Sequence, residues 1–173
     1  VEVVLRESRR IVRMDRGVLI AETQHGFICA NAGVDESNVN GAQQLTLLPV
    51  DPDSSARALR HRLQELSSEA ETADIAIIIS DTWGRPWRNA QVNMAIGVAG
   101  MAPIADYRGQ LDPYGYEMHA SMIAVADELA AAAELVMGKI DRVPAAIIRG
   151  YAYTPDEGDG RALLRDASTD MFR

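Results

Sequence analysis

The sequence predicts an α/β or α+β fold in which a mixed β-sheet is flanked by helices. Short apolar, β-branched runs typical of strands occupy residues 17–22, 26–30 and 75–79. Residues 51–66 and 120–136 carry the features of helices. Strands and helices interleave without strict alternation, which favours a mixed sheet over a regular parallel one.

The length and net charge of the chain limit the classes of protein to which it can belong. The 173 residues suffice for one domain, and 47% hydrophobic with 24% charged residues is a soluble globular composition. The net charge of -8 argues against nucleic acid or an anionic membrane as the main partner. No run approaches the roughly 20 apolar residues of a membrane helix, and no signal peptide is visible.

The single cysteine, Cys29, lies in an apolar run and is interpreted as a buried structural thiol, which fits a cytoplasmic protein. The chain starts VEVVLRESRR, without Met and within an element. We therefore expect residues 1–173 to be one domain that is truncated at its N-terminus, a fragment of a larger domain.

The first third of the chain contains a predicted hairpin. Residues 1–10 fit either a strand or a helix, and residues 17–22 and 26–30 fit two strands joined by a turn. His25 at that turn is interpreted as solvated, with a ligand role as the alternative.

A polar segment, NAGVDESN, follows the hairpin. If a helical turn begins at Asp35, its side chain and that of Asn38 share one face. A helix N-cap at Asp35 explains the same residues equally well, so a ligand site and a cap both remain open.

A helix is predicted to start at Asp51, Pro52 and Asp53, because proline and acids are favoured in a first turn. It continues to about Leu66, and its apolar stripe consists of Ala56, Leu59, Leu63 and Leu66.

The run at residues 75–79 reads as a strand that is buried on both faces. Asp81 and Thr82 follow it, at the end where open α/β sheets hold ligands. A turn with Gly and Pro then brings Arg85 and Arg88 within reach of an anion. The alternative is a strand end with a solvated loop.

The remaining elements are predicted from local signals. Gly97 within the apolar run 94–99 suggests a close backbone approach. Residues 103–116 form a long connection, and the alanine-rich helix 120–136 stops at Gly138. Residues 144–150 fit another strand, 156–160 a polar loop, and the C-terminus a helix or an arm.

Two polar clusters, Asp35 with Asn38 and Asp81 with Thr82, each follow an apolar run. If both face one crevice, they can hold Mg²⁺ or Mn²⁺, hard ions that prefer oxygen ligands, water and phosphates. The chain has no Gly-rich Lys-Ser/Thr phosphate loop and no zinc pattern.

Long ungapped motifs carry a resemblance to a known family. They are SRR at residues 8–10, RGVLIAETQHGFICANAGVDESNV, LLPVDPDSSAR, ISDTWGRPWR, ADELAAAAELVMGK and VPAAIIRG. These motifs resemble the coenzyme F420-0:L-glutamate ligases, especially the actinobacterial members, over nearly the whole chain.

The resemblance implies an F420 ligase-like α/β fold, a homodimer, and the GTP-dependent joining of L-glutamate to the deazaflavin precursor F420-0 through an acyl phosphate. Mg²⁺ or Mn²⁺ would occupy two sites, with K⁺ as a further candidate ion. Asp35 and Asp81 would hold the first metal and Thr82 the second. Asn38 would contact the nucleotide, as would the stretch Met137, Gly138 and Lys139.

Arg85 and Arg88 are assigned as catalytic anion clamps from their chemistry and not from the resemblance. The chain departs from the family at Lys139, where other members carry Gln, at Asn93, where an acid is common, and near Met122. The family's N-terminal segment, which contacts the nucleotide, is also missing. The departures at Asn93 and Met122 leave open the alternative that the chain is a ligase for another acid and amine. The missing segment leaves open the alternative that it is a non-catalytic dimerisation or binding remnant.

Overall fold

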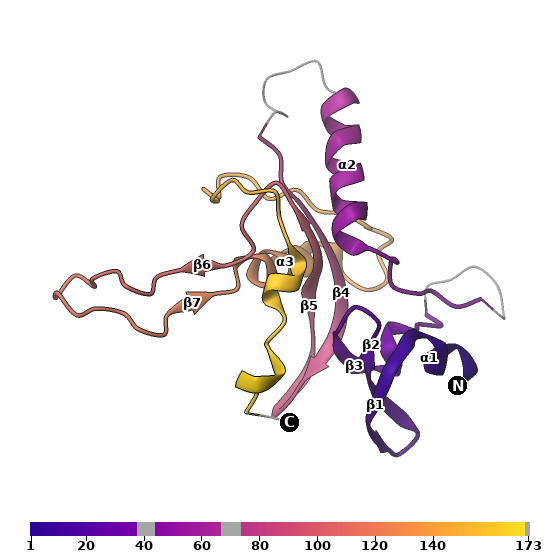
Figure 1. The fold of residues 1–173 in the computed structure, drawn as a ribbon. Helices are drawn as coiled ribbons and strands as arrows, with labels where there is room; N and C mark the ends of the chain where they lie inside the picture. The colour runs from indigo at the N-terminus through magenta and orange to yellow at the C-terminus, as the bar shows by residue number, and fades with distance from the viewer. Residues whose placement is uncertain (38–43, 67–73, 172–173) are drawn as a thin grey trace.

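A long antiparallel ribbon organises the fold of this chain, which we describe from a computed structural model for residues 1–37, 44–66 and 74–171 (Figure 1). The ribbon consists of β4 (Ile77–Arg85) and β5 (Arg88–Ala99), which pair along their whole length. Together with the helices, the strands form the predicted α+β fold. The described strands lie in three separate sheets and all pair antiparallel, where one mixed sheet was expected.

The other elements are arranged around the ribbon. They are α1 (Glu2–Glu7), β1 (Ser8–Asp15), β2 (Val18–Thr23), β3 (Ile28–Ala30), η1 (Asn31–Gly33), α2 (Pro52–Leu66), β6 (Ala105–Asp106), β7 (Met122–Ile123), α3 (Val125–Met137), η3 (Gly160–Leu163) and η4 (Ala167–Thr169).

The expectation of a strand that ends before Asp81 and is buried on both faces is wrong. β4 continues to Arg85, so Asp81 and Thr82 lie in mid-strand, paired with Met94 and Asn93. Most of β4 is only half-buried. Antiparallel ribbons accept polar residues within a strand because one face can approach solvent.

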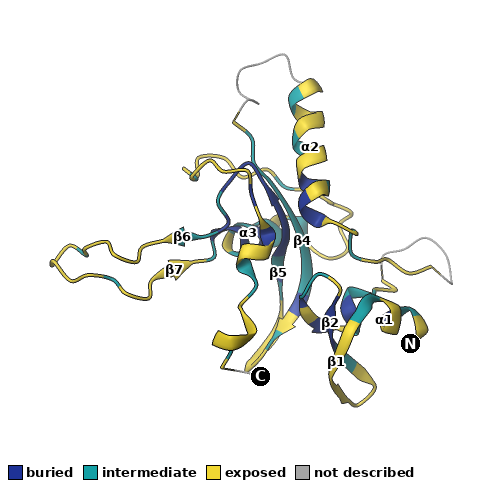
Figure 2. Cartoon of the chain, viewed as in Figure 1, coloured by how far each residue is buried: buried dark blue, intermediate teal, exposed yellow. Residues whose placement is uncertain are grey.

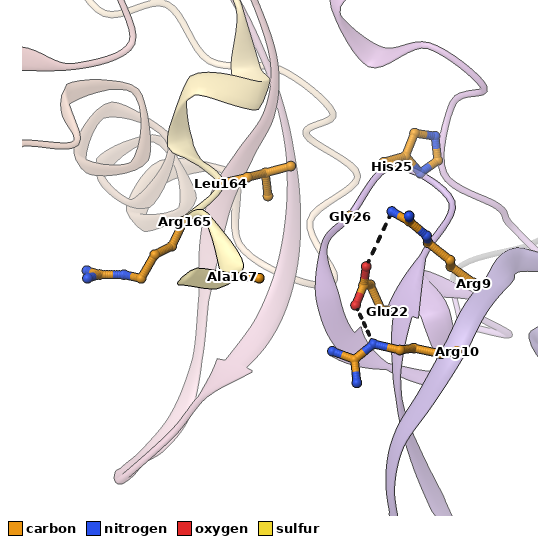
Figure 3. A pocket seen from close by; sticks show the side chains of 8 residues that line it. All are labelled: Arg9, Arg10, Glu22, His25, Gly26, Leu164, Arg165 and Ala167. Atoms are coloured by element: carbon orange, nitrogen blue, oxygen red, sulfur yellow. Dashed lines mark hydrogen bonds and ion pairs between the residues drawn. The ribbon is translucent and has the colours of Figure 1, made fainter. Parts of the chain in front are cut away.

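The predicted hairpin is confirmed, and it belongs to a three-stranded sheet in the order β1-β2-β3. The first ten residues form both expected structures in turn, a short helix and then a strand. The β1–β2 register shifts between Ser8 and Arg10, so that one β1 residue is extra. Figure 3 shows the result, in which Arg9 and Arg10 both approach Glu22 of β2.

Helix α2 starts as predicted, with Asp51 accepting a hydrogen bond from the Ser54 amide at 2.9 Å. Only its first turns pack against the ribbon. Ala56 is fully buried, whereas Leu59 and the later leucines of the stripe are substantially exposed. Gly97 makes the close approach predicted for it, because a Cβ there would lie 2.4 Å from the Pro52 carbonyl carbon and oxygen.

Two carboxylates accept hydrogen bonds from amides of β5. The Val98 amide donates to Asp53 at 2.8 Å, and the Ala95 amide donates to Asp127 at 2.9 Å. Asp53 also accepts from the Gly160 amide at 2.9 Å. These side chains satisfy backbone donors that would otherwise remain unpaired, and they fix α2, α3 and η3 to the ribbon.

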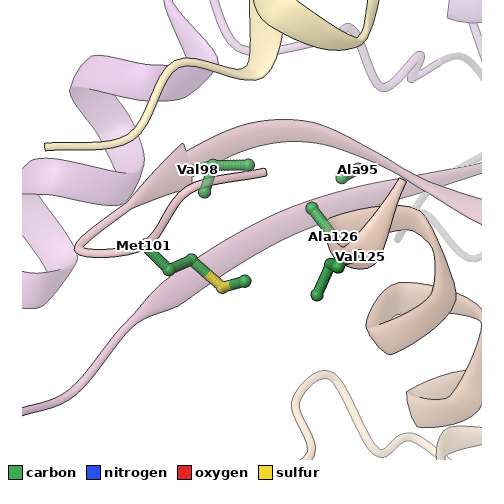
Figure 4. Packing of buried hydrophobic residues seen from close by; sticks show 5 residues of the cluster. All are labelled: Ala95, Val98, Met101, Val125 and Ala126. Carbon is green, nitrogen blue, oxygen red and sulfur yellow. The ribbon is translucent and has the colours of Figure 1, made fainter. Parts of the chain in front are cut away.

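The main core lies between the ribbon and α3 (Figure 4), and burial is concentrated in β5, β2 and the packed turns of both long helices (Figure 2). Its buried members are Ala95, Val98, Met101, Val125 and Ala126. A second cluster joins the opposite face of the ribbon to β3 and consists of Phe27, Cys29, Trp83 and Ile96. Cys29 is therefore the buried thiol that was predicted.

The last third of the chain differs most from the prediction. α3 starts at Val125, later than expected, and ends as predicted before Gly138, whose amide donates to Glu134. The connection 103–123 forms a long arm, held by β6–β7 and a bridge between Leu111 and Glu117, that projects from the body (Figure 1). Residues 144–150 are not a strand, because nothing in the described chain pairs with them. Residues 156–159 form the expected loop, and the C-terminus contains the short turns η3 and η4.

Helices of the described ranges are all too short or too polar to cross a bilayer.

Candidate functional site

The candidate site is centred on Asp81, in the middle of β4. Its carboxylate is half-buried, and Oδ1 accepts a hydrogen bond from the Thr82 amide at 2.8 Å. Asp81 shares a face of the ribbon with Trp83 and Met94, which pack against β3. The carboxylate therefore lies beside the second apolar cluster.

Asp35 reaches this region from the segment after η1. Its backbone forms a bridge with Thr46, and its two carboxylate oxygens accept from the Ser37 amide at 2.8 Å and the Ser37 hydroxyl at 2.7 Å. Asp35 itself is therefore in a β-bridge and closes a side-chain turn on Ser37, while the segment that would form a helix after it lies outside the described residues. Asn38 lies outside the described residues.

The two carboxylates influence each other electrostatically. Burial raises the pKa of Asp81, and the negative charge of Asp35 raises it further. Partial burial also acts to raise the pKa of Asp35, but hydrogen bonds from Ser37 and the charge of Lys139 outweigh it and leave that pKa below its ordinary value. A desolvated carboxylate beside a second negative charge is an environment that a cation would stabilise.

Lys139 is the cation that acts on both carboxylates. It follows α3 and Gly138, and its positive charge lowers the pKa of Asp35 and opposes the rise at Asp81. Within the predicted stretch Met137–Lys139, Lys139 is the residue whose charge acts on Asp35 and Asp81. The sequence prediction had connected Lys139 with a nucleotide and not with the carboxylates.

Cys29 adjoins the same region from β3. Burial raises the pKa of its thiol to about 11, and the negative charge of Asp81 contributes to the rise. The thiol is therefore protonated at neutral pH. It contributes no charge to the site and is a poor metal ligand, because the thiolate is the form that binds metals.

Thr82 faces away from Asp81. Consecutive strand residues point to opposite faces, and the Thr82 hydroxyl donates to Asn93 Oδ1 at 2.6 Å across the ribbon. Asn93 is 4% exposed. The structure thus pairs Thr82 with Asn93 and does not bring its hydroxyl together with the Asp81 carboxylate.

Arg85 and Arg88 face each other across the end of the ribbon. Four residues of strand separate Arg85 from Asp81, about 13 Å. Its Nη1 is buried and has no hydrogen-bond partner among the described residues, whereas Arg88 is exposed. The two arginines form a separate basic end of the ribbon, and the structure does not bring them to the carboxylate pair.

The donor set fits a hard divalent ion better than a soft one. In the described part of the chain, no three His, Cys, Asp or Glu side chains are grouped as metal ligands. Two carboxylates with room for water and phosphate oxygens are the usual protein contribution to a Mg²⁺ site. A four-ligand zinc site needs more protein groups than this region supplies.

Sequence reasoning missed the contacts of Glu22 with Arg9 and Arg10, at 3.7 Å and 2.7 Å. The sequence did contain an indication of these contacts, because Arg9 and Arg10 are adjacent and Glu22 lies on the next predicted strand. The β-bulge that aims both arginines at one acid cannot be read from that pattern.

Comparison with known proteins adds an independent result. A family model described as F420-0:Gamma-glutamyl ligase matches residues 1–150. A protein of Methanothermobacter thermautotrophicus named coenzyme F420:L-glutamate ligase is 49% identical over 176 residues, which cover 100% of this chain and 68% of the relative. The protein of that name from Methanopyrus kandleri is 47% identical over 178 residues, covering 100% and 69%. The Methanocaldococcus jannaschii protein is 41% identical over 174 residues, covering 100% and 68%.

Proposed function

Because this chain belongs to the F420-0:gamma-glutamyl ligase family, we propose that it joins the amino group of L-glutamate to the terminal carboxylate of F420-0 in coenzyme F420 biosynthesis. Similarity to relatives named coenzyme F420:L-glutamate ligase over 100% of the chain supports this assignment. The observation that carries the site is the paired negative charge of Asp35 and Asp81.

The proposed reaction activates the carboxylate with GTP. A carboxylate oxygen of F420-0 attacks the γ-phosphorus, the bond from that phosphorus to the β-phosphate oxygen breaks, and GDP leaves. The glutamate amine then attacks the acyl carbon, inorganic phosphate leaves with the carbon–oxygen bonding electrons, and the amine nitrogen loses a proton.

In this proposal Asp35 and Asp81 hold one Mg²⁺ or Mn²⁺, which when bound would neutralise phosphate charge during transfer. The raised pKa of Asp81 supports the proposal, because a divalent ion relieves the repulsion between the two carboxylates. Lys139 supplies further positive charge to the same pair. A second ion at Thr82, nucleotide contacts from Asn38, Met137 and Gly138, and anion binding by Arg85 and Arg88 remain proposals that rest on the sequence alone.

The acyl-phosphate step has a direct test. F420-0 labelled with ¹⁸O in its terminal carboxylate is converted with GTP and glutamate, and the released phosphate is weighed by mass spectrometry. Transfer of one ¹⁸O atom to phosphate is expected. Product formed with unlabelled phosphate would contradict the acyl-phosphate route without contradicting the ligase assignment.

Asn93 favours a second candidate function, the ligation of a different acid and amine. Its buried side chain accepts from the hydroxyl of Thr82, the strand neighbour of Asp81, at a position where the resemblance leads us to expect an acid. A panel of amino acids, assayed with F420-0 and GTP, separates the two candidates. Glutamate as the best acceptor supports the first, and another preferred amine supports the second.

We also propose a homodimer. Large apolar side chains of residues 135–147 remain exposed, with Leu135 at 87%, Ile140 at 85% and Ile147 at 80%. Large exposed apolar side chains that lie near one another in sequence would be covered in such a dimer, since exposed apolar patches mark protein interfaces.

A further inference from the structure

A second polar cavity lies between the β1–β2–β3 sheet and the C-terminal segment near Leu164 (Figure 3). Its volume is about 470 Å³, within the range of small-molecule sites. It joins segments more than 130 residues apart in sequence, and neither Asp35 nor Asp81 lines it.

A β-bulge gives this cavity its charge. Ser8 pairs with Thr23 and Arg10 pairs with Glu22, so Arg9 is the extra residue of β1. In a regular strand, Arg9 and Arg10 would point to opposite faces. The bulge instead places both opposite one residue, Glu22, and bulges commonly re-aim side chains in this way at functional sites.

Glu22 holds the Arg10 guanidinium by a hydrogen bond and attracts that of Arg9 in an ion pair. Its side chain is 9% exposed, its Oε2 lies 2.7 Å from Arg10 Nε, and its Oε1 lies 3.7 Å from Arg9 Nη1. A buried carboxylate that orients one arginine and attracts a second is a supporting contact of the kind that prepares a binding site. Most guanidinium N–H groups of Arg9 and Arg10 make no hydrogen bond to the described residues and remain available as donors.

The side chains of Arg9, Arg10 and Glu22 give this cavity a net positive charge, whereas the chain as a whole is negative. Arg9 and Arg10 carry two positive charges against the one negative charge of Glu22, whereas the chain carries -8. Arg165 also lines the cavity, but its guanidinium points away from Glu22 (Figure 3). The His25 ring forms a fixed wall, because its Nε2 donates to the Pro49 carbonyl at 2.8 Å.

We propose that this cavity binds an oxyanion, a phosphate or carboxylate group, through Arg9 and Arg10. The planar arginine fork matches both groups and binds them with charge-assisted hydrogen bonds. The net negative charge of the chain would repel an anion. The β-bulge offsets this repulsion locally, because it places the positive charges of Arg9 and Arg10 together above the buried Glu22.

The cavity adjoins the other site through the turn that leads into β3. Gly26, in the turn before β3, lines the cavity, and Cys29 of β3, three residues further along, adjoins Asp81, so at most about 10 Å of chain separates them. One elongated anionic substrate can therefore span both places. The oxyanion proposal itself requires neither a metal ion nor ligase activity.

Calorimetric titration with pyrophosphate and, separately, glutarate tests the proposal on the purified protein. EDTA in the buffer removes divalent ions, so binding at the Asp35–Asp81 pair through a metal cannot contribute. Arg9→Ala and Arg10→Ala are each expected to weaken binding about 10-fold to 100-fold, the effect of losing a charged hydrogen bond. Arg13→Ala, on the same strand but outside the cavity, should leave affinity unchanged.

Each outcome decides the proposal. Arg9- and Arg10-dependent binding of pyrophosphate identifies the natural group as a phosphate, and such binding of glutarate identifies it as a carboxylate. Failure of both probes to bind the unaltered protein would overturn the proposal. Equal affinities in Arg10→Ala and Arg13→Ala would also overturn it. Circular dichroism of each variant verifies that the sheet has folded, and Arg9→Lys provides a conservative variant that retains the charge but loses the fork.

Discussion

Asp81 combines burial with a neighbouring negative charge, and both raise its pKa. A carboxyl whose folded pKa is raised holds its proton in the folded state to a higher pH than in the unfolded chain. Its contribution to stability is therefore present at low pH and is lost as pH rises through the raised pKa. Once ionised, Asp81 opposes folding, as expected of a residue kept for function.

Asp81→Asn should therefore fold as well as the unaltered protein at pH 7 and lose its response to metal. At 100 times the dissociation constant, Mn²⁺ should raise the melting temperature of the unaltered protein by about 5 to 10 °C. Differential scanning fluorimetry should show almost no rise for Asp81→Asn, together with a fall in metal-dependent turnover of about 100-fold or more.

Asp127→Asn is the matched control. Asp127 is also half-buried, has a pKa raised by burial and accepts one backbone amide at 2.9 Å. Its metal response should be retained. Equal Mn²⁺ stabilisation of both variants would exclude Asp81 as a metal ligand.

Cys29 gives a second pH prediction, at alkaline pH. Its pKa is about 11 in the folded protein against an ordinary value of 9.0. Between these values the folded state retains a proton that the unfolded chain loses, so stability falls as pH rises. The loss should approach about 2 to 3 kcal/mol by pH 11.

Urea unfolding at several pH values measures this loss. Cys29→Ala should show a correspondingly shallower fall between pH 9 and pH 11, although it is less stable overall because of the cavity it leaves. Identical pH slopes for the two proteins would mean that the thiol is not held protonated by its surroundings.

Residue-level sequence reasoning found the acidic pair but not its surroundings. Asp35 and Asp81 could be selected because each follows an apolar run. The local structure of Asp35 could not be predicted, because its bridge partner Thr46 is eleven residues away and a helix cap explained the local pattern equally well. The Thr82–Asn93 contact depends on the cross-strand register and is equally non-local.

At the scale of elements, the junction between α2 and β5 depends on a glycine. A Cβ at Gly97 would lie 2.4 Å from backbone atoms of Pro52, which cannot move without displacing the helix. Gly97→Ala should destabilise the protein by at least about 2 kcal/mol because the contact is overpacked.

Gly84→Ala, in the other strand of the ribbon, is the control, because a Cβ there meets no atom within 4 Å. Its stability should stay close to that of the unaltered protein. Equal unfolding midpoints for the two variants would show that the helix and the ribbon do not pack this closely in solution.

Elements with strong local signals were predictable, and those defined by distant pairing were not. The hairpin turn, the start of α2 and the glycine stop of α3 are confirmed. The apolar run at residues 144–150 is not a strand, because strand propensity is realised only where a partner is available. The extension of β4 through Asp81 follows from its pairing with β5 and not from its composition.

At the scale of the whole molecule, the exposed apolar side chains around residues 135–147 predict self-association. Analytical ultracentrifugation should show a dimer. The double variant Ile140→Glu, Ile147→Glu should shift the protein to monomer by burying charge in the interface. Leu59→Glu, on the exposed part of α2, should leave the dimer intact.

A monomeric unaltered protein at micromolar concentration would contradict the homodimer. It would leave the ligase assignment standing, because that assignment rests on family membership and on the acidic pair.

The ligase assignment is the central claim, and the most direct measurement is the mass of the product. The protein is incubated with F420-0, L-glutamate, GTP and Mn²⁺, and the deazaflavin is analysed by mass spectrometry. We predict a gain of one glutamate residue or more that requires metal and is lost in Asp81→Asn but not in Asp127→Asn. Unchanged F420-0, from a folded protein that binds GTP and Mn²⁺, would contradict the account and direct attention to another acid and amine.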